Sequence, residues 1–176
     1  TDEQKASTKK AILNKDFRQA VNFGFDRKSY AAQVSGSDAA ENTLRSTLVP
    51  PTYVQVNGED FGKVVEKQLV TYGDQWKGVS LADGQTSLYN PEKAKASFAK
   101  AKAELQKQGV QFPIHLDLPV DQAAKTTVAR AQSLKQSVEK TLGKENVVVD
   151  VHQMSQDDLL NSTLYAANAA AEDWDI

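Results

Sequence analysis

Cysteine is absent from the 176-residue sequence. Its absence excludes disulfide bonds, thiolate metal sites and a cysteine nucleophile, and it leaves the redox compartment open. A domain of this size buries roughly 70% of the surface of its unfolded chain, so hydrophobic burial alone can hold it together. We therefore predict a single domain, residues 1–176, that needs neither cross-links nor a structural metal.

An excess of positive charge and long hydrophobic runs are also lacking. The formal net charge is −2 with a pI near 5.7, and lysine and arginine are spread among aspartate and glutamate. This balance disfavours a nucleic-acid surface. No apolar run approaches the roughly 20 residues of a membrane span, and no charged-then-apolar leader opens the sequence. We expect any signal or lipid anchor to lie outside these residues.

Recognisable catalytic motifs are missing as well. There is no glycine-rich phosphate loop, no G-x-S-x-G elbow and no H-E-x-x-H. The two histidines, His115 and His152, each lie two positions from an aspartate, Asp117 and Asp150 respectively. Such a pair could serve acid–base chemistry or a metal, but a metal site needs three or four ligands. We therefore favour solvent-facing strand residues and predict no catalytic residue, no metal and no cofactor.

The best-defined patterns lie between residues 89 and 151. Apolar residues recur at three- and four-residue steps in two segments, and they alternate or run continuously in two others. The predicted elements are a helix at 91–108, a strand at 112–118, a helix at 122–142 and a strand at 147–151. A helix of this length between two strands makes a right-handed crossover, which predicts parallel strands. The fold class is therefore α/β, with a parallel-sheet βαβ core and flanking helices.

The N-terminal half gives weaker signals. Residues 1–13 are polar and without periodicity, so we interpret them as a solvated lead-in. Asp16 is the expected cap of a first helix, and Asp26 the expected cap of a second helix at 27–34. Residues 37–88 are loop-rich, with one short helix at 60–69. Such a long connection is either functional or packs over the sheet without touching a ligand, and the latter is favoured slightly.

After the second strand, the sequence predicts one more helix and one more strand. Ser155 resembles the start of a capping box, which predicts a helix at 156–170. Residues 174–176 (WDI) are typical of the start of a third strand, which indicates that the natural chain continues.

Candidate ligand contacts follow from the predicted parallel sheet. Ligands of open parallel sheets bind beyond the carboxyl ends of the strands. Pro119 is expected to end the first strand, Val120 to lie in the following loop, and Asp121 either to cap the next helix or to reach a ligand. Capping is favoured because Asp121 opens a periodic helix. These observations indicate half of an α/β ligand-binding domain.

A second candidate contact is the segment Val49, Pro50 and Pro51. Each proline fixes its own φ and disfavours the α region for the residue before it, so this segment is expected to be extended. It lies within the loop-rich region, where binding residues often occur.

Several motifs resemble those of a known family. Residues 17–27 (FRQAVNFGFDR), 48–51 (LVPP) and 89–95 (YNPEKAK), with 174–176 at the end, resemble motifs of the extracellular solute-binding proteins of oligopeptide and dipeptide ABC transporters. In the residues of these motifs, the sequence is most similar to the streptococcal oligopeptide-binding lipoproteins. The order and spacing match the second lobe along essentially the whole chain. The resemblance implies part of one lobe of a type II periplasmic-binding-protein-like fold.

The resemblance also implies a function and partners. The parent protein would capture extracellular oligopeptides in a cleft between two lobes and deliver them to the permease subunits of an ABC importer. It would be a monomer, lipid-anchored at the extracellular face of the membrane, and this chain would contact the remaining lobe. The family segment that holds the peptide main chain follows residue 176 and is not part of the sequence.

Two other function classes stay open. One is a doubly wound α/β enzyme domain that binds a nucleotide or a small metabolite at the same strand edge. Such an enzyme should carry a glycine-rich first β–α turn, which residues 118–121 lack. The other is a structural scaffold, for which the sequence offers no feature for or against.

Overall fold

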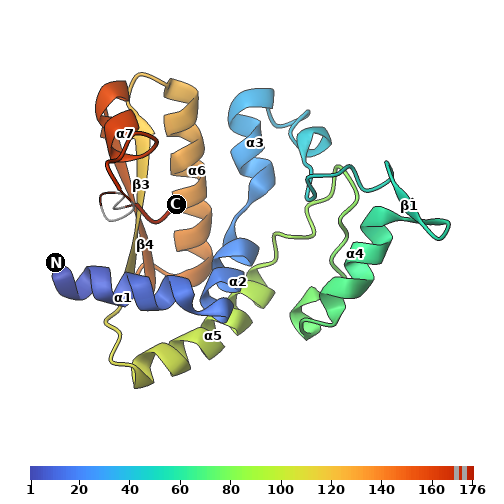
Figure 1. The fold of residues 1–176 in the computed structure, drawn as a ribbon, viewed down its shortest axis with the longest axis horizontal. Helices are drawn as coiled ribbons and strands as arrows, with labels where there is room; N and C mark the ends of the chain where they lie inside the picture. Colours follow the sequence, from blue (N-terminus) through green and yellow to red (C-terminus); the bar gives the residue numbers. More distant parts are fainter. Residues whose placement is uncertain (169–170, 172–173) are drawn as a thin grey trace.

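The computed structural model describes residues 1–168, 171 and 174–176. In chain order its elements are α1 (Asp2–Leu13), α2 (Lys15–Gly24), α3 (Arg27–Ser35), the 3₁₀ helix η1 (Glu41–Thr43), β1 (Gln55–Val56), β2 (Glu59–Asp60), α4 (Phe61–Val70), the 3₁₀ helix η2 (Asp74–Trp76), α5 (Pro91–Lys107), β3 (Ile114–Asp121), α6 (Lys125–Leu142), β4 (Val147–Met154) and α7 (Gln156–Ser162). Figure 1 shows β3 and β4 side by side with α6 along them.

The centre of the fold is the predicted βαβ unit. β3 and β4 pair in parallel over their whole length, from Ile114 opposite Val147 to Asp121 opposite Met154. The intervening α6 provides the crossover that parallel pairing requires. The prediction of two parallel strands within an α/β fold is confirmed.

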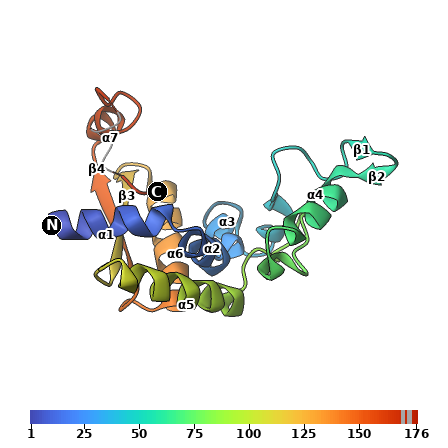
Figure 2. The same cartoon turned by 60° about the horizontal axis from the view of Figure 1, so that its bottom comes forward.

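The core lies where this sheet meets α2, α5 and α6. Alternate residues of both strands are fully buried there, including Ile114, Val147 and Val149. Phe17 of α2 contacts Phe98 of α5, with their ring centroids 6.4 Å apart. Aromatic pairs of this geometry add to the hydrophobic burial. Figure 2 shows α5 below the sheet and α2 between α5 and α3.

Residues 44–88 form an arm beside this body. Figures 1 and 2 both place the arm on the far side of α2 and α3 from the sheet, so it does not pack over the sheet as expected. It holds α4, which confirms the short helix predicted at 60–69, and the β1–β2 hairpin. Trp76 connects the arm to the body, because its ring packs on Phe23 with 5.3 Å between centroids.

The interpretation of residues 1–13 as a lead-in is wrong. They form α1, which begins with a capping box between Thr1 and Gln4. Its polar residues are buried because they have partners: Ser7 Oγ accepts from the Gln111 N–H at 3.1 Å, and Thr8 Oγ1 donates to the His115 carbonyl at 2.7 Å. A helix whose buried face is polar shows no hydrophobic periodicity, so the sequence pattern missed it.

Two predicted caps differ from the structure. Asn14, not Asp16, caps α2, since its side chain accepts from the Phe17 N–H at 3.0 Å. Asp121 does not cap α6, which begins at Lys125 after Ala124 without any side-chain cap. The predicted caps of α3 and α7, Asp26 and Ser155, are confirmed, and the side chain of Asn90 caps α5.

The C-terminal part is less regular than predicted. Helix α7 ends at Ser162, whereas a helix to residue 170 was expected, and residues 169–170 of that range lie outside the described residues. The third strand predicted at 174–176 is not formed as a strand. Its backbone nevertheless lies against β3, because the N–H groups of Asp175 and Ile176 donate to the Asp117 carbonyl at 3.1 and 3.3 Å.

Candidate functional site

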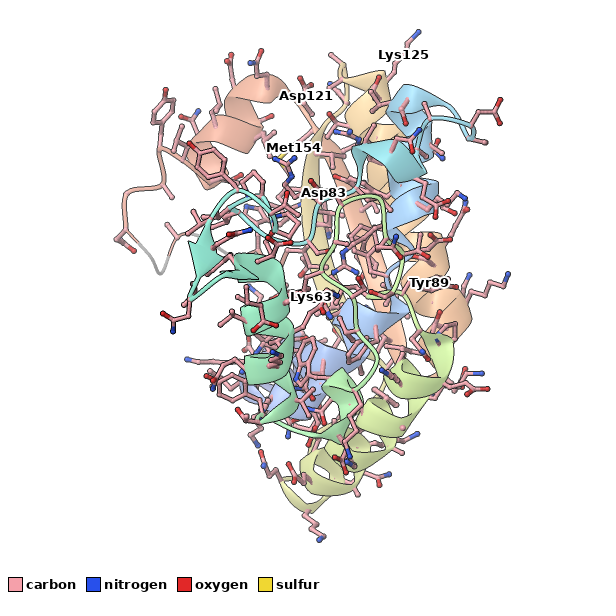
Figure 3. The ribbon with its side chains drawn as sticks, turned by 90° about the vertical axis from the view of Figure 1, so that its right-hand side faces the viewer. Lys63, Asp83, Tyr89, Asp121, Lys125 and Met154 are labelled. Atoms are coloured by element: carbon pink, nitrogen blue, oxygen red, sulfur yellow. The ribbon has the colours of Figure 1, made fainter. Side chains whose placement is uncertain are left out.

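The carboxyl ends of β3 and β4 are the site predicted from the parallel sheet. Figure 3 shows Asp121, Lys125 and Met154 together at this end. Here Ser155 caps α7, and Trp174 Nε1 donates to the Ser162 carbonyl at 3.0 Å. The strand ends, the start of α6 and α7 therefore meet at one edge.

Asp121 shapes the turn between β3 and α6. Its Oδ1 accepts from the Ala123 N–H at 2.8 Å, and its carbonyl accepts from the Ala124 N–H at 3.1 Å. This is a side-chain turn of the kind that aspartate favours, and it occupies one carboxylate oxygen. The side chain is half-buried.

Pro119 does not end β3, which continues to Asp121. The N–H groups of Ile114 and Gln122 bond to carbonyls at the two ends of β4, so the even-numbered N–H groups of β3 point toward β4. The missing N–H of Pro119 therefore lies on the outer edge, where proline is tolerated. Val120 lies in β3 and not in a following loop as expected, and it is 3% exposed. Its side chain supports the strand end from inside.

The outer edge of β3 at Asp117 is paired with the C-terminal residues Asp175 and Ile176. The Asp117 N–H donates to Asp175 Oδ2 at 2.9 Å, and its carbonyl accepts from the two backbone N–H groups already described. The sequence pointed to this pairing through the apolar and aromatic residues at 174–176, although it did not predict the side-chain contact of Asp175.

A mostly apolar pocket of about 360 Å³ lies beside this edge. Phe17, Val21, Leu116 and Ile176 are among its lining residues. Arg27 also lines it, and its guanidinium donates to Asn22 Oδ1 at 2.6 Å and to the Asn22 carbonyl at 3.0 Å. Burial lowers the pKa of Arg27. The pocket offers apolar contact next to the strand edge at which Asp175 and Ile176 bond to Asp117.

The two histidines form cross-strand pairs. His115 Nδ1 lies 2.6 Å from Asp150 Oδ2, and His152 Nε2 lies 2.6 Å from Asp117 Oδ1. Both pairs run diagonally across the sheet, because Asp117 is directly opposite Asp150. The sequence associated each histidine with the aspartate on its own strand. In the parallel register, each histidine instead pairs with the aspartate on the neighbouring strand. The four side chains are between 30% and 45% exposed, as expected for solvent-facing strand residues.

The opposite edge of the sheet is closed by α6. Glu139, 5% exposed, accepts from the Val149 N–H at 3.1 Å and from Lys135 Nζ at 2.7 Å, and Lys135 also donates to the Val149 carbonyl. Burial alone raises the pKa of Glu139, but these hydrogen bonds and the charges of Lys135 and Lys144 outweigh it and hold the pKa below its ordinary value. The free backbone groups of β4 at Val149 are thus satisfied by side chains.

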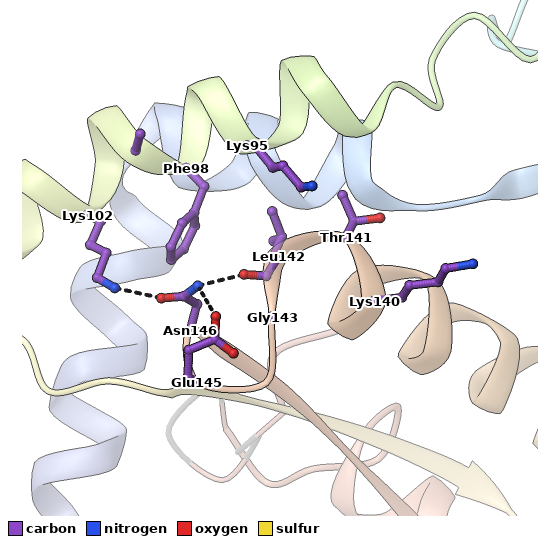
Figure 4. A pocket seen from close by; sticks show the side chains of 10 residues that line it. Lys95, Phe98, Lys102, Lys140, Thr141, Leu142, Gly143, Glu145 and Asn146 are labelled. Carbon is purple, nitrogen blue, oxygen red and sulfur yellow. Dashed lines mark hydrogen bonds between the residues drawn. The ribbon is translucent and has the colours of Figure 1, made fainter.

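A second pocket, of about 450 Å³, lies between α5 and the turn from α6 to β4, away from the strand ends (Figure 4). Lys95, Lys102 and Lys140 are among its lining residues. Lys102 Nζ donates to Asn146 Oδ1 at 2.7 Å, and Asn146 Nδ2 donates to the Leu142 carbonyl at 2.6 Å. These lysines lie near the carbonyl end of α6, where positive charge offsets the helix dipole.

The second predicted segment lies elsewhere. Val49 is 39% exposed, Pro50 is half-buried and Pro51 is buried. Pro51 lines a small pocket of about 130 Å³ against α4. Figures 1 and 2 show the arm and β3 on opposite sides of α3, so the structure does not bring this segment to Pro119 and Asp121.

The described residues contain no group of three or more histidine, aspartate or glutamate side chains placed to hold a metal ion. In the same part of the chain, none of the helices is long and apolar enough to cross a bilayer. The parallel β3–α6–β4 unit and the apolar pocket beside the outer edge of β3 are typical of one part of an α/β ligand-binding protein.

Comparison with known proteins makes the class specific. The sequence model for the middle part of the bacterial extracellular solute-binding proteins, family 5, matches residues 4–176, and the chain belongs to this family. It is 62% identical over all 176 residues to the oligopeptide-binding protein AliA of Streptococcus pneumoniae. It is 60% identical to SarA of Streptococcus gordonii and 59% identical to AmiA of S. pneumoniae, both also named oligopeptide-binding proteins. The chain spans 26–27% of the length of these relatives.

Proposed function

We propose that this chain is the middle part of an extracellular oligopeptide-binding protein that delivers peptides to the permease of an ABC importer. The observation that carries the proposal is 50–62% identity, along the whole chain, to several proteins named for oligopeptide binding. In this proposal the chain belongs to the second lobe of a two-lobed, type II binding-protein fold. The parent is a monomer, and a lipid anchor holds it at the outer face of the membrane.

The proposed ligand contacts lie at the strand ends. Pro119 and Asp121 are partly exposed there, and Val120 supports them from inside the fold. Val49 and Pro50, partly accessible on the arm, are a second candidate that only closure of the whole protein could bring to a ligand. Closure of two lobes around a cleft is a hinge motion, and it encloses the ligand on both sides.

An enzymatic role is not favoured. The β3–α6 turn, where a doubly wound nucleotide-binding enzyme would carry its glycines, reads Asp121-Gln122-Ala123-Ala124. This turn is closed by the Asp121 side chain instead. Its geometry supports a binding module rather than a phosphate loop.

Calorimetric titration of the full-length protein tests the proposal. Extended oligopeptides should bind, whereas single amino acids and nucleotides should not, because a cleft for extended peptides gains most of its contacts from several residues of main chain. Nucleotide binding without peptide binding would overturn the proposal. Substituting Pro119 and Val120, which lie in the last part of β3, and finding unchanged peptide affinity would remove this end of the strand from the binding site.

A further inference from the structure

Arg130 of α6 differs from the other arginines of the chain. Those three each donate to an acceptor: Arg18 to the Ile12 carbonyl, Arg27 to Asn22 and Arg45 to Asp83. Arg130 makes no hydrogen bond or ion pair with the residues that the structure describes, and its Nε is buried. A guanidinium withdrawn from water without an acceptor is costly, so we expect its partner to come from outside this chain.

Tyr30 holds the guanidinium in place. The Arg130 side chain lies over the Tyr30 ring on the neighbouring helix α3, with 5.1 Å between the guanidinium carbon and the ring centroid. The Phe25 ring meets the Tyr30 ring edge to face at 5.2 Å, which fixes the ring that supports the arginine. An aromatic face attracts a cation but gives its N–H groups no acceptor in their own plane. The donors of Arg130 are thus oriented and unused.

The two helices around Arg130 supply no carboxylate for it. α3 contains no acidic residue, and the only one in α6 is Glu139, which binds Lys135 and the Val149 N–H. The carboxylates that flank α3 are also engaged, because Asp26 accepts from Ser29 and Glu41 pairs with Lys28.

Arg130 lies close to the carboxyl ends of the strands. α6 begins at Lys125, which Figure 3 shows with Asp121 and Met154 at this edge. Arg130 follows five residues later, or about 7.5 Å along the helix axis, and side chains of a helix tilt back toward its N-terminus. The residue is partly exposed, so a group bound at this edge can reach it.

We propose that Arg130, supported by Tyr30, binds a carboxylate of the bound oligopeptide. A planar guanidinium that is already stacked presents paired N–H donors, which match the two oxygens of a carboxylate. Oligopeptides carry this group at the C-terminus and on glutamate or aspartate side chains, and the relatives are named for binding oligopeptides. The inference rests on the proposed function and adds a specificity-determining residue to it.

Calorimetric titration of the full-length protein tests the role of Arg130. Oligopeptides with a free C-terminus and one glutamate, placed at each position in turn, are compared with two neutral versions: one amidated at the C-terminus, the other with glutamine for glutamate. The wild-type protein should bind at least one neutral version about tenfold or more weakly than the acid, because a charge-assisted hydrogen bond is lost. The amide reports on the terminal carboxylate and the glutamine version on the side chain.

Arg130→Gln should lose this discrimination and bind the acid and neutral versions equally. Lys140→Gln, an exposed position near the other end of α6, removes the same charge and should keep the wild-type ratio. Arg130→Lys keeps the charge without the planar fork and should retain only part of the ratio. The ratio of the two affinities is a readout that a purely structural contact between Arg130 and Tyr30 would not move.

Two results would overturn the inference while peptide binding itself stands. One is equal affinity of the wild-type protein for the acid and both neutral versions. The other is an unchanged ratio in Arg130→Gln. Absence of binding by every peptide would instead show that the proposed function is wrong, and the inference would fail with it.

Discussion

Glu139 provides the sharpest test of how the sheet is held. Glu139→Ala removes the acceptor of both the Val149 N–H and the Lys135 ammonium. Hydrogen bonds to a charged group contribute about 1.5–3 kcal/mol each. The Lys135 side chain is 28% exposed and can turn to water, so its loss belongs at the low end of that range. We expect a loss of about 3 kcal/mol in the free energy of unfolding, or about 6–12 °C in Tm for a chain of this size.

Urea denaturation of the chain at pH 7 measures this loss. Asp38→Asn, an exposed carboxylate, is the matched control and should change stability by less than about 0.5 kcal/mol. A loss below about 1 kcal/mol in Glu139→Ala would refute the reasoning that Glu139 holds the β4 edge.

The pH dependence of Glu139→Gln gives a second readout. Because the folded pKa lies below the ordinary value of 4.5, the stabilisation by the charged carboxylate is fully present above pH 4.5. It is lost as the pH falls through the lower folded value. The stability difference between the wild-type chain and Glu139→Gln should therefore be constant near neutral pH and shrink only below 4.5. A difference that shrinks between pH 6 and 8 would contradict this sign.

Three further substitutions test other parts of the account. Asp121→Ala should lower the free energy of unfolding by about 1 kcal/mol, since it removes one turn hydrogen bond, and Asp121→Asn should restore most of it in urea titrations. Gly62→Ala would place a Cβ 2.5 Å from Pro51 Cβ, so it should cost about 1–3 kcal/mol and speed proteolysis of the arm. Arg27→Lys should cost about 1–2 kcal/mol in thermal unfolding, because lysine cannot bond both Asn22 acceptors in the same fork; an unchanged Tm would argue against this role.

The elements that the sequence predicted well are those with their own local signals. The residues of β3, α6 and β4 alternate or recur with a clear period, and Asn90 before Pro91 marks the start of α5. Their arrangement follows from the handedness of the crossover, which does not depend on distant residues. For this reason the parallel pairing could be predicted without any knowledge of the rest of the fold.

The elements that the sequence missed depend on contacts between distant residues. α1 buries Ser7 and Thr8 because Gln111 and His115, more than 100 positions away, offer backbone partners. No local pattern reports such a partner. The spacing of Lys135 and Glu139 was visible as an (i, i+4) pair, but only the packing of α6 on β4 shows that it closes a sheet edge.

The candidate site was predicted in location more than in detail. The strand ends lie where the parallel sheet requires, yet Asp121 closes a turn instead of capping α6, because α6 starts three residues later than its periodicity indicated. The segment Val49 to Pro51 was correctly placed in an irregular region, but it is not extended as expected: the chain bends at Val49, and the Pro50 carbonyl accepts from the Tyr53 N–H at 3.0 Å in a turn. Its position across α3 from the strand ends depends on the packing of Trp76 on Phe23, which the sequence alone does not reveal.

The central claim is that this chain is one part of a peptide receptor whose binding site needs the rest of the protein. Its most direct test is calorimetric titration of the isolated chain and of the full-length protein with the same set of oligopeptides. Peptide enclosed between two lobes loses most of its buried contacts when one lobe is absent. The full-length protein should therefore bind with submicromolar affinity, and the isolated chain should not. Submicromolar binding by the isolated chain, or none by the full-length protein, would contradict the account.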